Sequence, residues 1–227
     1  MSRLADELRR ELSSAADPVK APRMQAYMKS EMPYWGVQTP SMREICRRVF
    51  AAYPITTATE WRRTCLDVWR NSDHREQRYA AIELTGHRLY LTWQTLYALP
   101  MYEEMIVTGA WWDYVDPIAT ARLGPLLRKY PAPMRQKMLA WSRSKNIWKR
   151  RSAILSQLSF KAETNLEFLY AVIEPSFASK EFFLQKAIGW ALRQYAWTNP
   201  REVRRYVRAH AGQLSALSQR EALKNIA

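Results

Sequence analysis

Apolar residues recur at helical spacing along almost the whole chain of 227 residues, and no long strand pattern of alternating polar and apolar positions appears. Several places also carry signals that begin helices. Three of them put a capping residue directly before a proline: Asp17-Pro18, Thr39-Pro40 and Asn199-Pro200. Three others have the spacing of a capping box: Thr57-x-x-Glu60, Thr164-x-x-Glu167 and Ser218-x-x-Glu221.

Polar breaks separate these helical patterns at short intervals. They fall near residues 71–73, 86–92, 130–133, 143–146 and 174–179. The breaks and the start signals together predict about a dozen helices with short connections. Because no linker and no low-complexity segment interrupts the pattern, the sequence predicts an all-α protein with one domain over residues 1–227.

A weak internal repeat organises these helices. The segments 78–82, 150–154 and 185–189 resemble one another, at offsets of 72 and 35 residues, and 114–118 falls at the missing step. A period near 36 residues is typical of helix-pair repeats of the HEAT kind, which stack into a solenoid with a concave face. We expect one helix of each pair to line that face. Equivalent positions would then point the same way: Tyr79, Arg151 and Lys186.

The charge balance indicates a polyanionic partner. Lys and Arg total 35 against 21 Asp and Glu, which gives a net charge of +14 and a pI near 10.0. Nucleic acid is the first candidate. With 48% hydrophobic residues the chain is not a disordered basic tail, and only 6 glycines argue against glycine-rich phosphate loops.

The sequence argues against a metal centre, a secretory route and a membrane span. Cys46 and Cys65 cannot by themselves form a cysteine-ligated zinc or iron–sulfur site, and they are expected to be buried thiols in a reducing compartment. Residues 1–14 have no apolar signal core. The longest uncharged run, 89–102, is too short and too polar to cross a bilayer. We therefore expect a cytoplasmic protein, associated with the nucleoid when it binds DNA.

Basic and aromatic residues gather in three places. Five cations crowd 143–151, and a second group lies on one helix face: Arg201, Arg204, Arg205 and Arg208. Trp190 is flanked on its helix by Lys186 and Arg193. Such residues are commonly solvated surface or helical core, but tryptophan beside cations on a concave face also suits stacking on a nucleotide.

Asp116 has two interpretations. Followed by Pro117, it could be the N-cap of a helix that begins there, with Trp112 in the preceding loop. If the helix instead begins near Trp112, then Trp112 and Asp116 share one helix face, and Asp116 is a carboxylate in a cationic groove. The pattern alone does not decide between them. The sequence supports neither a histidine-ligated metal site nor a nucleotide-binding site. His74, His87 and His210 lack metal-ligand spacing, and no Walker loop occurs.

Several motifs together resemble the AlkD-type DNA alkylation-repair glycosylases, a family of HEAT-like repeats. The similar segments run from about residue 20 to the C-terminus: 27–29, 36–40, 106–108, 111–116, 146–155, 179–190, 192–196 and 218–222. The most specific are Asn146-Ile147-Trp148-x-x-Arg151, Gln185-Lys186-Ala187-Ile188-Gly189-Trp190 and Leu192-Arg193-x-Tyr195-Ala196. The basic pair Lys149-Arg150 and the proline after Asp116 are mild departures from the family pattern.

The resemblance implies a six-repeat α-solenoid that excises N3- and N7-alkylated purines from duplex DNA without flipping the base into a pocket. It assigns the catalytic carboxylate to Asp116 and the two lesion-flanking tryptophans to Trp112 and Trp190. The DNA contacts that we expect on this basis are Arg151, Arg193, Lys186, Tyr27, Gln38 and Thr39. No metal and no cofactor is implied, and a monomer is expected.

A different class of function remains open at this stage. A non-catalytic solenoid that binds DNA or an acidic protein partner would have the same composition and the same repeats. Only the set of Trp112, Asp116 and Trp190 favours the enzyme. Formation of abasic sites in duplex DNA that carries 7-methylguanine would separate the two classes.

Overall fold

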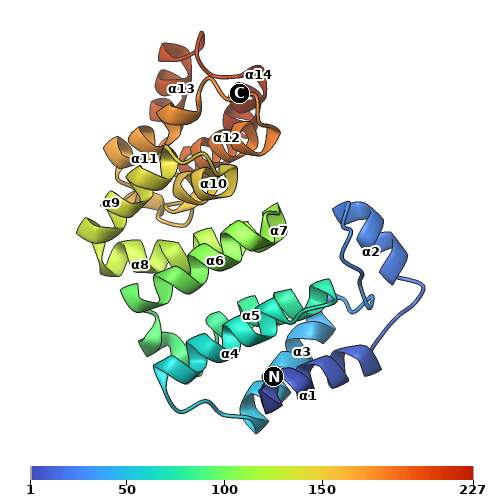
Figure 1. Cartoon of the computed structure of the whole chain (residues 1–227). Coiled ribbons are helices and arrows are strands. Elements are labelled where there is room, and N and C mark those ends of the chain that lie inside the picture. The colour runs from blue at the N-terminus through green and yellow to red at the C-terminus, as the bar shows by residue number, and fades with distance from the viewer. Residues whose placement is uncertain (1, 227) are drawn as a thin grey trace. The chain divides into compact units, whose positions relative to one another are not determined.

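The computed structural model describes residues 2–226, and these residues form helices and their connections with no strand (Figure 1). The all-α prediction is therefore confirmed for this part of the chain. The residues divide into two compact units, one up to Met101 and the other from Tyr102 onward. The prediction of a single domain over residues 1–227 stays a prediction.

The first unit holds five α-helices followed by two 3-10 turns. These are α1 (Arg3–Ser14), α2 (Ala21–Met28), α3 (Thr39–Ala52), α4 (Ala58–Arg70), α5 (Arg75–Thr85), η1 (Arg88–Trp93) and η2 (Leu96–Ala98). Helices α1, α3, α4 and α5 pack against one another. Their apolar faces bury the large side chains of the unit almost completely: Leu8, Leu12, Phe50, Trp61 and Trp69.

The second unit holds the remaining helices; α6 begins just before it. These are α6 (Leu99–Gly109), α7 (Trp112–Ile118), η3 (Ala119–Leu123, π-helical), α8 (Gly124–Lys129), α9 (Pro131–Ser142), α10 (Ile147–Leu155), η4 (Lys161–Glu163), α11 (Leu166–Ile173), η5 (Glu174–Ser176), α12 (Phe182–Ala196), α13 (Pro200–Ala209) and α14 (Ala216–Leu223). Helix α10 packs against α7, α9, α11 and α12, and α12 packs most extensively against α14. This stacking of neighbouring helices is the arrangement expected of helix-pair repeats.

Some predicted helix starts are confirmed by capping hydrogen bonds. The Thr57 hydroxyl accepts a hydrogen bond from the Glu60 backbone N–H, and α4 begins directly after it. Asn199 caps α13 in the same way, through the N–H of Glu202. In both cases a short polar side chain satisfies an N–H group that has no partner within the helix, which stabilises the first turn.

Other starts are displaced. The N-cap of α11 is Asn165, one residue after the predicted Thr164. The prediction for Ser218 is wrong, because Ser215 caps α14 and Ser218 lies inside the helix, where its hydroxyl donates to the Gln185 carbonyl. A serine is equally able to cap and to bridge two helices, so the local pattern could not distinguish the two roles.

Helices α12 and α14 approach each other closely at Gly189. A β-carbon added to Gly189 would lie 2.4 Å from Glu221 Cβ and 2.9 Å from the Ser218 carbonyl oxygen. We expect Gly189→Ala to destabilise the protein by about 1–3 kcal/mol, because one of the helices must move to relieve the clash. Urea denaturation measures this loss. Gly212→Ala is the control, because an added β-carbon there meets nothing within 4 Å, and an equal effect of both changes would contradict the prediction.

Candidate active site

Helices α7, α10 and α12 form the layer that carries most of the predicted site residues. Helix α10 packs against both of the others. Asp116 and Trp112 lie on α7, Arg151 lies on α10, and Trp190 lies on α12. The roughly 36-residue repeat brings these distant segments into one layer of the second unit. In Figure 1, α12 lies beside α14, near the C-terminus.

The local structure of α7 decides between the two interpretations of Asp116. The helix begins at Trp112, with Trp111 as its N-cap, so Asp116 lies inside the helix, one turn after Trp112. The N-cap interpretation is therefore wrong. Pro117 stands within the same helix and cannot donate the usual i→i−4 hydrogen bond. The next turn is π-helical, and the Thr120 hydroxyl donates to the Asp116 carbonyl at 2.8 Å; such wide turns recur at functional sites.

Asp116 and Arg151 form a buried, bidentate ion pair. Arg151 Nε donates to one carboxylate oxygen of Asp116 at 2.7 Å, and Nη2 donates to the other at 2.7 Å. The residues are only 9% and 5% exposed. Arg151 Nη1 donates to the Phe183 carbonyl at 2.5 Å. The planar guanidinium matches the carboxylate, so this geometry fixes the plane of the Asp116 carboxyl group.

Burial and the ion pair act in opposite directions on the Asp116 carboxyl. Desolvation raises the pKa of Asp116, and the hydrogen bonds and positive charge of Arg151 counteract that rise, while Asp113 adds to it. The net effect raises the pKa of Asp116, because burial is the largest contribution. A carboxylate with these surroundings is a stronger base and is less screened by water than one on the surface.

An aromatic cluster supports Arg151. The Phe183 ring lies 6.0 Å from the centre of the guanidinium group and packs against Trp111 and Trp148, with ring centroids 5.2 and 5.0 Å away. The sequence pattern included Phe183 in the family-like segment 179–190, but not as a partner of Arg151. Its role depends on a backbone carbonyl, for which a side-chain pattern carries no signal.

The two tryptophans of the predicted site are both partly exposed. Trp112 is half-buried on α7, and Trp190 is half-buried on α12, where it packs against the apolar core of the second unit. Each ring can therefore present apolar surface to a ligand while its other parts remain anchored. The structure gives Trp112 and Asp116 a common helix, and it places Trp190 on the helix next to that of Arg151.

Lys186 and Arg193, which flank Trp190, share one carboxylate. Lys186 Nζ lies 2.9 Å from one oxygen of Glu221 on α14, and Arg193 Nη1 lies 2.6 Å from the other. The sequence pattern placed Glu221 in a capping box and in the family-like segment 218–222, but gave it no partner. Its pairing was detectable in principle, because four charged residues follow one another at intervals of 35: Asp116, Arg151, Lys186 and Glu221.

The remaining predicted DNA contacts lie in the first unit. Tyr27 is 77% exposed on α2. Gln38 and Thr39 are exposed at the start of α3, and the Gln38 side chain makes no capping bond. The preceding backbone is held by Glu76, whose carboxylate accepts hydrogen bonds from the N–H groups of residues 35–37 at 3.1, 2.8 and 3.0 Å. This buried anchor fixes the chain that leads into the exposed start of α3.

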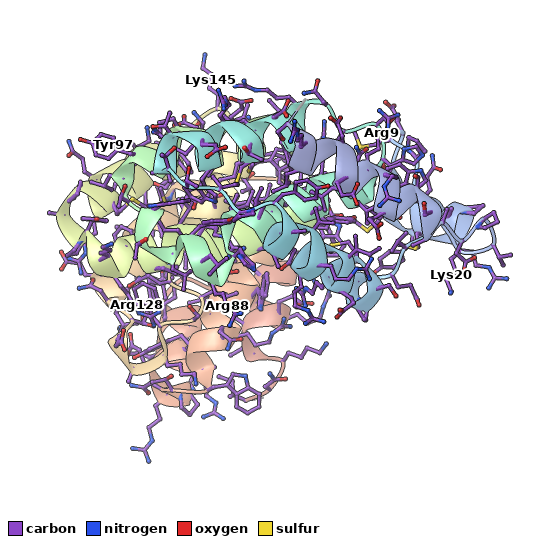
Figure 2. All side chains as sticks on the ribbon, turned by 90° about the horizontal axis from the view of Figure 1, so that it is seen from below. Arg9, Lys20, Arg88, Tyr97, Arg128 and Lys145 are labelled. Atoms are coloured by element: carbon purple, nitrogen blue, oxygen red, sulfur yellow. The ribbon has the colours of Figure 1, made fainter. Side chains whose placement is uncertain are left out.

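The two basic clusters found in the sequence are partly engaged in structural contacts. Arg150 donates to the Pro175 carbonyl, Lys149 pairs with Glu103, and Arg205 pairs with Glu202. Lys145 is exposed and points away from the ribbon (Figure 2). Because some of the 35 Lys and Arg side chains have internal partners, fewer of them are free to neutralise phosphates than their number suggests.

Residues 2–226 contain neither a metal-binding cluster nor a membrane-spanning helix. No group of three His, Cys, Asp or Glu side chains there is placed to hold a metal ion. None of the helices in the same range has both the length and the apolar character needed to cross a membrane.

Comparisons with known proteins agree on one family. The model of a family described as DNA alkylation repair enzyme matches residues 8–226. Among solved structures, the chain is similar to a "Predicted DNA alkylation repair enzyme from Enterococcus faecalis", with 28% identity and a TM-score of 0.84, over 93% of this chain and 97% of that one. No curated protein matches the sequence. The predicted fold class, an all-α stack of HEAT-like helix pairs, is consistent with this match and is confirmed.

Proposed function

The chain belongs to the family of DNA alkylation repair enzymes, and we propose that it is a DNA glycosylase that removes N3- and N7-alkylated purines from duplex DNA. The buried carboxylate of Asp116 on the α7–α10–α12 layer is the observation that carries this proposal. The net charge of +14 supports a polyanionic substrate. The proposal takes residues 1–227 as one functional domain, acting as a monomer in the cytoplasm and on nucleoid DNA.

The chemistry of the lesion explains why few catalytic groups are needed. An N3- or N7-alkylpurine carries a positive charge, and it leaves as a neutral base when the bond between its nitrogen and sugar C1′ breaks. The bonding electrons leave with the base, so the base needs no added proton. Positive charge develops on the deoxyribose, as in other glycoside hydrolyses. Water then bonds to C1′ and releases one proton to solvent, which leaves an abasic site.

Asp116 is suited to stabilising the sugar cation. Its carboxylate lies in a buried site, where an anion stabilises developing positive charge more strongly than in water. It also accepts a hydrogen bond from the attacking water and orients it. Trp112 and Trp190 present their π-faces to the same cationic sugar, which adds cation–π attraction. The lesion stays in the DNA stack in this proposal, unlike the general pattern in which the base is flipped into a pocket.

The direct test is release of 7-methylguanine from a defined duplex. We expect the purified protein to convert the lesion into an abasic site without added metal or nucleotide. Strand cleavage by hot alkali measures the abasic sites, and a reaction without protein corrects for spontaneous depurination. Tight binding to the same duplex without release of base would favour the non-catalytic solenoid instead.

Binding to undamaged duplex DNA is expected to depend steeply on salt. Lys and Arg side chains that contact phosphates displace condensed counterions, so the logarithm of the affinity falls linearly with the logarithm of salt concentration. A surface that neutralises about six phosphates loses roughly 10³-fold in affinity between about 50 and 200 mM salt. Fluorescence anisotropy of a labelled duplex measures the slope. A flat response would show that the charge serves another partner.

A further inference from the structure

The C-terminal helix α14 is fastened to the helix that carries Trp190. At Gly189, the residue before Trp190, α12 lies so close to α14 that an added β-carbon would clash with Glu221 and Ser218. The Ser218 hydroxyl donates to the Gln185 carbonyl at 2.9 Å. Both contacts lie on the turn of α12 that directly precedes Trp190, so α14 packs against the backbone that leads to this side chain.

Glu221 on α14 forms ion pairs with Lys186 and Arg193 of α12, and we call these three residues the clamp. Lys186, Trp190 and Arg193 stand at positions i, i+4 and i+7 of α12 and therefore share one face of the helix. Glu221 pairs with the first and the last of them, at 2.9 and 2.6 Å.

The clamp is only partly open to water. The Glu221 side chain is 13% exposed, against 37% for Lys186 and 23% for Arg193. The hydrogen bond from Lys186 lowers the pKa of Glu221, so the carboxylate is charged at neutral pH.

We propose that Glu221 is a positioning residue, which holds Trp190 in place through Lys186 and Arg193 and limits how far both cations can reach toward DNA phosphates. This inference rests on the proposed function, because it assigns Trp190 a place against the lesion. Both cations retain further N–H donors, so they can contact phosphate from their clamped positions. Their reach is then set by Glu221 and not by the phosphate.

The Asp116–Arg151 ion pair joins α7 to α10 in the way that the Glu221–Lys186 ion pair joins α14 to α12. In each case a carboxylate holds a cation that lies 35 residues away, on the neighbouring helix. Arg151 is held by the proposed catalytic carboxylate. Lys186 is held by a carboxylate that lies beside the tryptophan. Ion pairs between residues 35 apart therefore occur both at Asp116 and beside Trp190, the two parts of the proposed site.

Glu221→Gln tests the proposal through opposite changes in turnover and binding. We expect single-turnover excision of 7-methylguanine to slow by about tenfold, because small displacements of a positioned group cost rate. Binding to undamaged duplex should hold or tighten, and its salt slope should steepen by about 0.9 for each phosphate that a freed cation gains. A merely structural role would weaken binding and turnover together.

Glu202→Gln is the matched control. Glu202 on α13 is a carboxylate of similar exposure, 16%, which also bridges two partners, Arg205 and Tyr170, at 2.6 Å each. Glu202→Gln removes one negative charge from the second unit, as Glu221→Gln does. Excision at the wild-type rate by this control, with slow excision by Glu221→Gln, supports the proposal. Equal slowing in both variants, or wild-type excision by Glu221→Gln, overturns it.

Two further measurements keep the outcome decisive. If Glu221→Gln does not fold, Glu221→Asp replaces it. The charge then remains, but the shorter side chain cannot reach both cations. Slow excision by this variant supports the clamp, and excision at the wild-type rate overturns it. If the wild-type protein releases no base, the proposed function fails and binding decides alone. A steeper salt slope for Glu221→Gln than for Glu202→Gln then supports restraint of the cations, and equal slopes overturn it.

Discussion

Replacing Asp116 by asparagine is expected to slow excision of 7-methylguanine by at least about 10²-fold, the loss that follows removal of one preorganised electrostatic group. The amide is nearly the size of the carboxylate but carries no charge, so it cannot stabilise the cationic sugar. DNA binding should hold or tighten, because one negative charge near the phosphates is gone. Single-turnover excision and anisotropy measure the two effects separately.

The buried ion pair affects how this experiment is designed. Arg151 donates to both oxygens of Asp116, and an amide can accept at only one of its two positions. Asp116→Asn therefore also costs stability, so excision must be measured well below the melting temperature of the variant.

Glu103→Gln is a suitable control for this loss. Glu103 is another partly buried carboxylate of the second unit, and it pairs with Lys137 and Lys149. We expect this control to excise at nearly the wild-type rate. Near-wild-type excision by Asp116→Asn would remove the catalytic assignment.

The helical fold was largely predictable from the sequence because its determinants are local. Helical periodicity, polar breaks and capping side chains act within a few residues, and Thr57 and Asn199 cap helices as predicted. Two of the failures share a physical cause. Ser218 and Asp116 both fit an N-cap by sequence, but each makes its decisive side-chain contact with a neighbouring helix, which no local pattern records.

The sequence predicted which helices lie together, but not which of their side chains pair with one another. Repeats predicted that distant helices would form one layer, and α7, α10 and α12 do so. The sequence could not show which cations are buried. Arg151 is buried and donates to Asp116 and Phe183, and the cations beside Trp190 share Glu221, so their contact with phosphate stays a prediction. Charge counts treat all of these side chains as equally free, whereas burial and pairing separate them.

Replacing Arg151 by alanine is expected to destabilise the second unit by about 3–5 kcal/mol, because it leaves the Asp116 carboxylate buried without a partner. The same change removes the group that counteracts burial, so the pKa of Asp116 should rise further. Excision should then fall as the carboxylate takes up a proton, and the fall should be larger at low pH. Binding to damaged and undamaged duplex should weaken alike if Arg151 also contacts a phosphate.

A double-mutant cycle separates the ion pair from the loss of the side chain. Asp116→Asn combined with Arg151→Ala leaves neither a buried carboxylate nor a buried guanidinium, so the double variant should be more stable than the sum of the two single losses implies. The coupling energy from urea denaturation reports this difference, and its expected size is about 1–3 kcal/mol for residues in one network. Excision by the double variant should be no faster than by Asp116→Asn, because restored stability does not replace the missing charge. Additive stabilities would mean that Asp116 and Arg151 do not depend on each other, which would contradict the role of Arg151 in orienting the carboxylate.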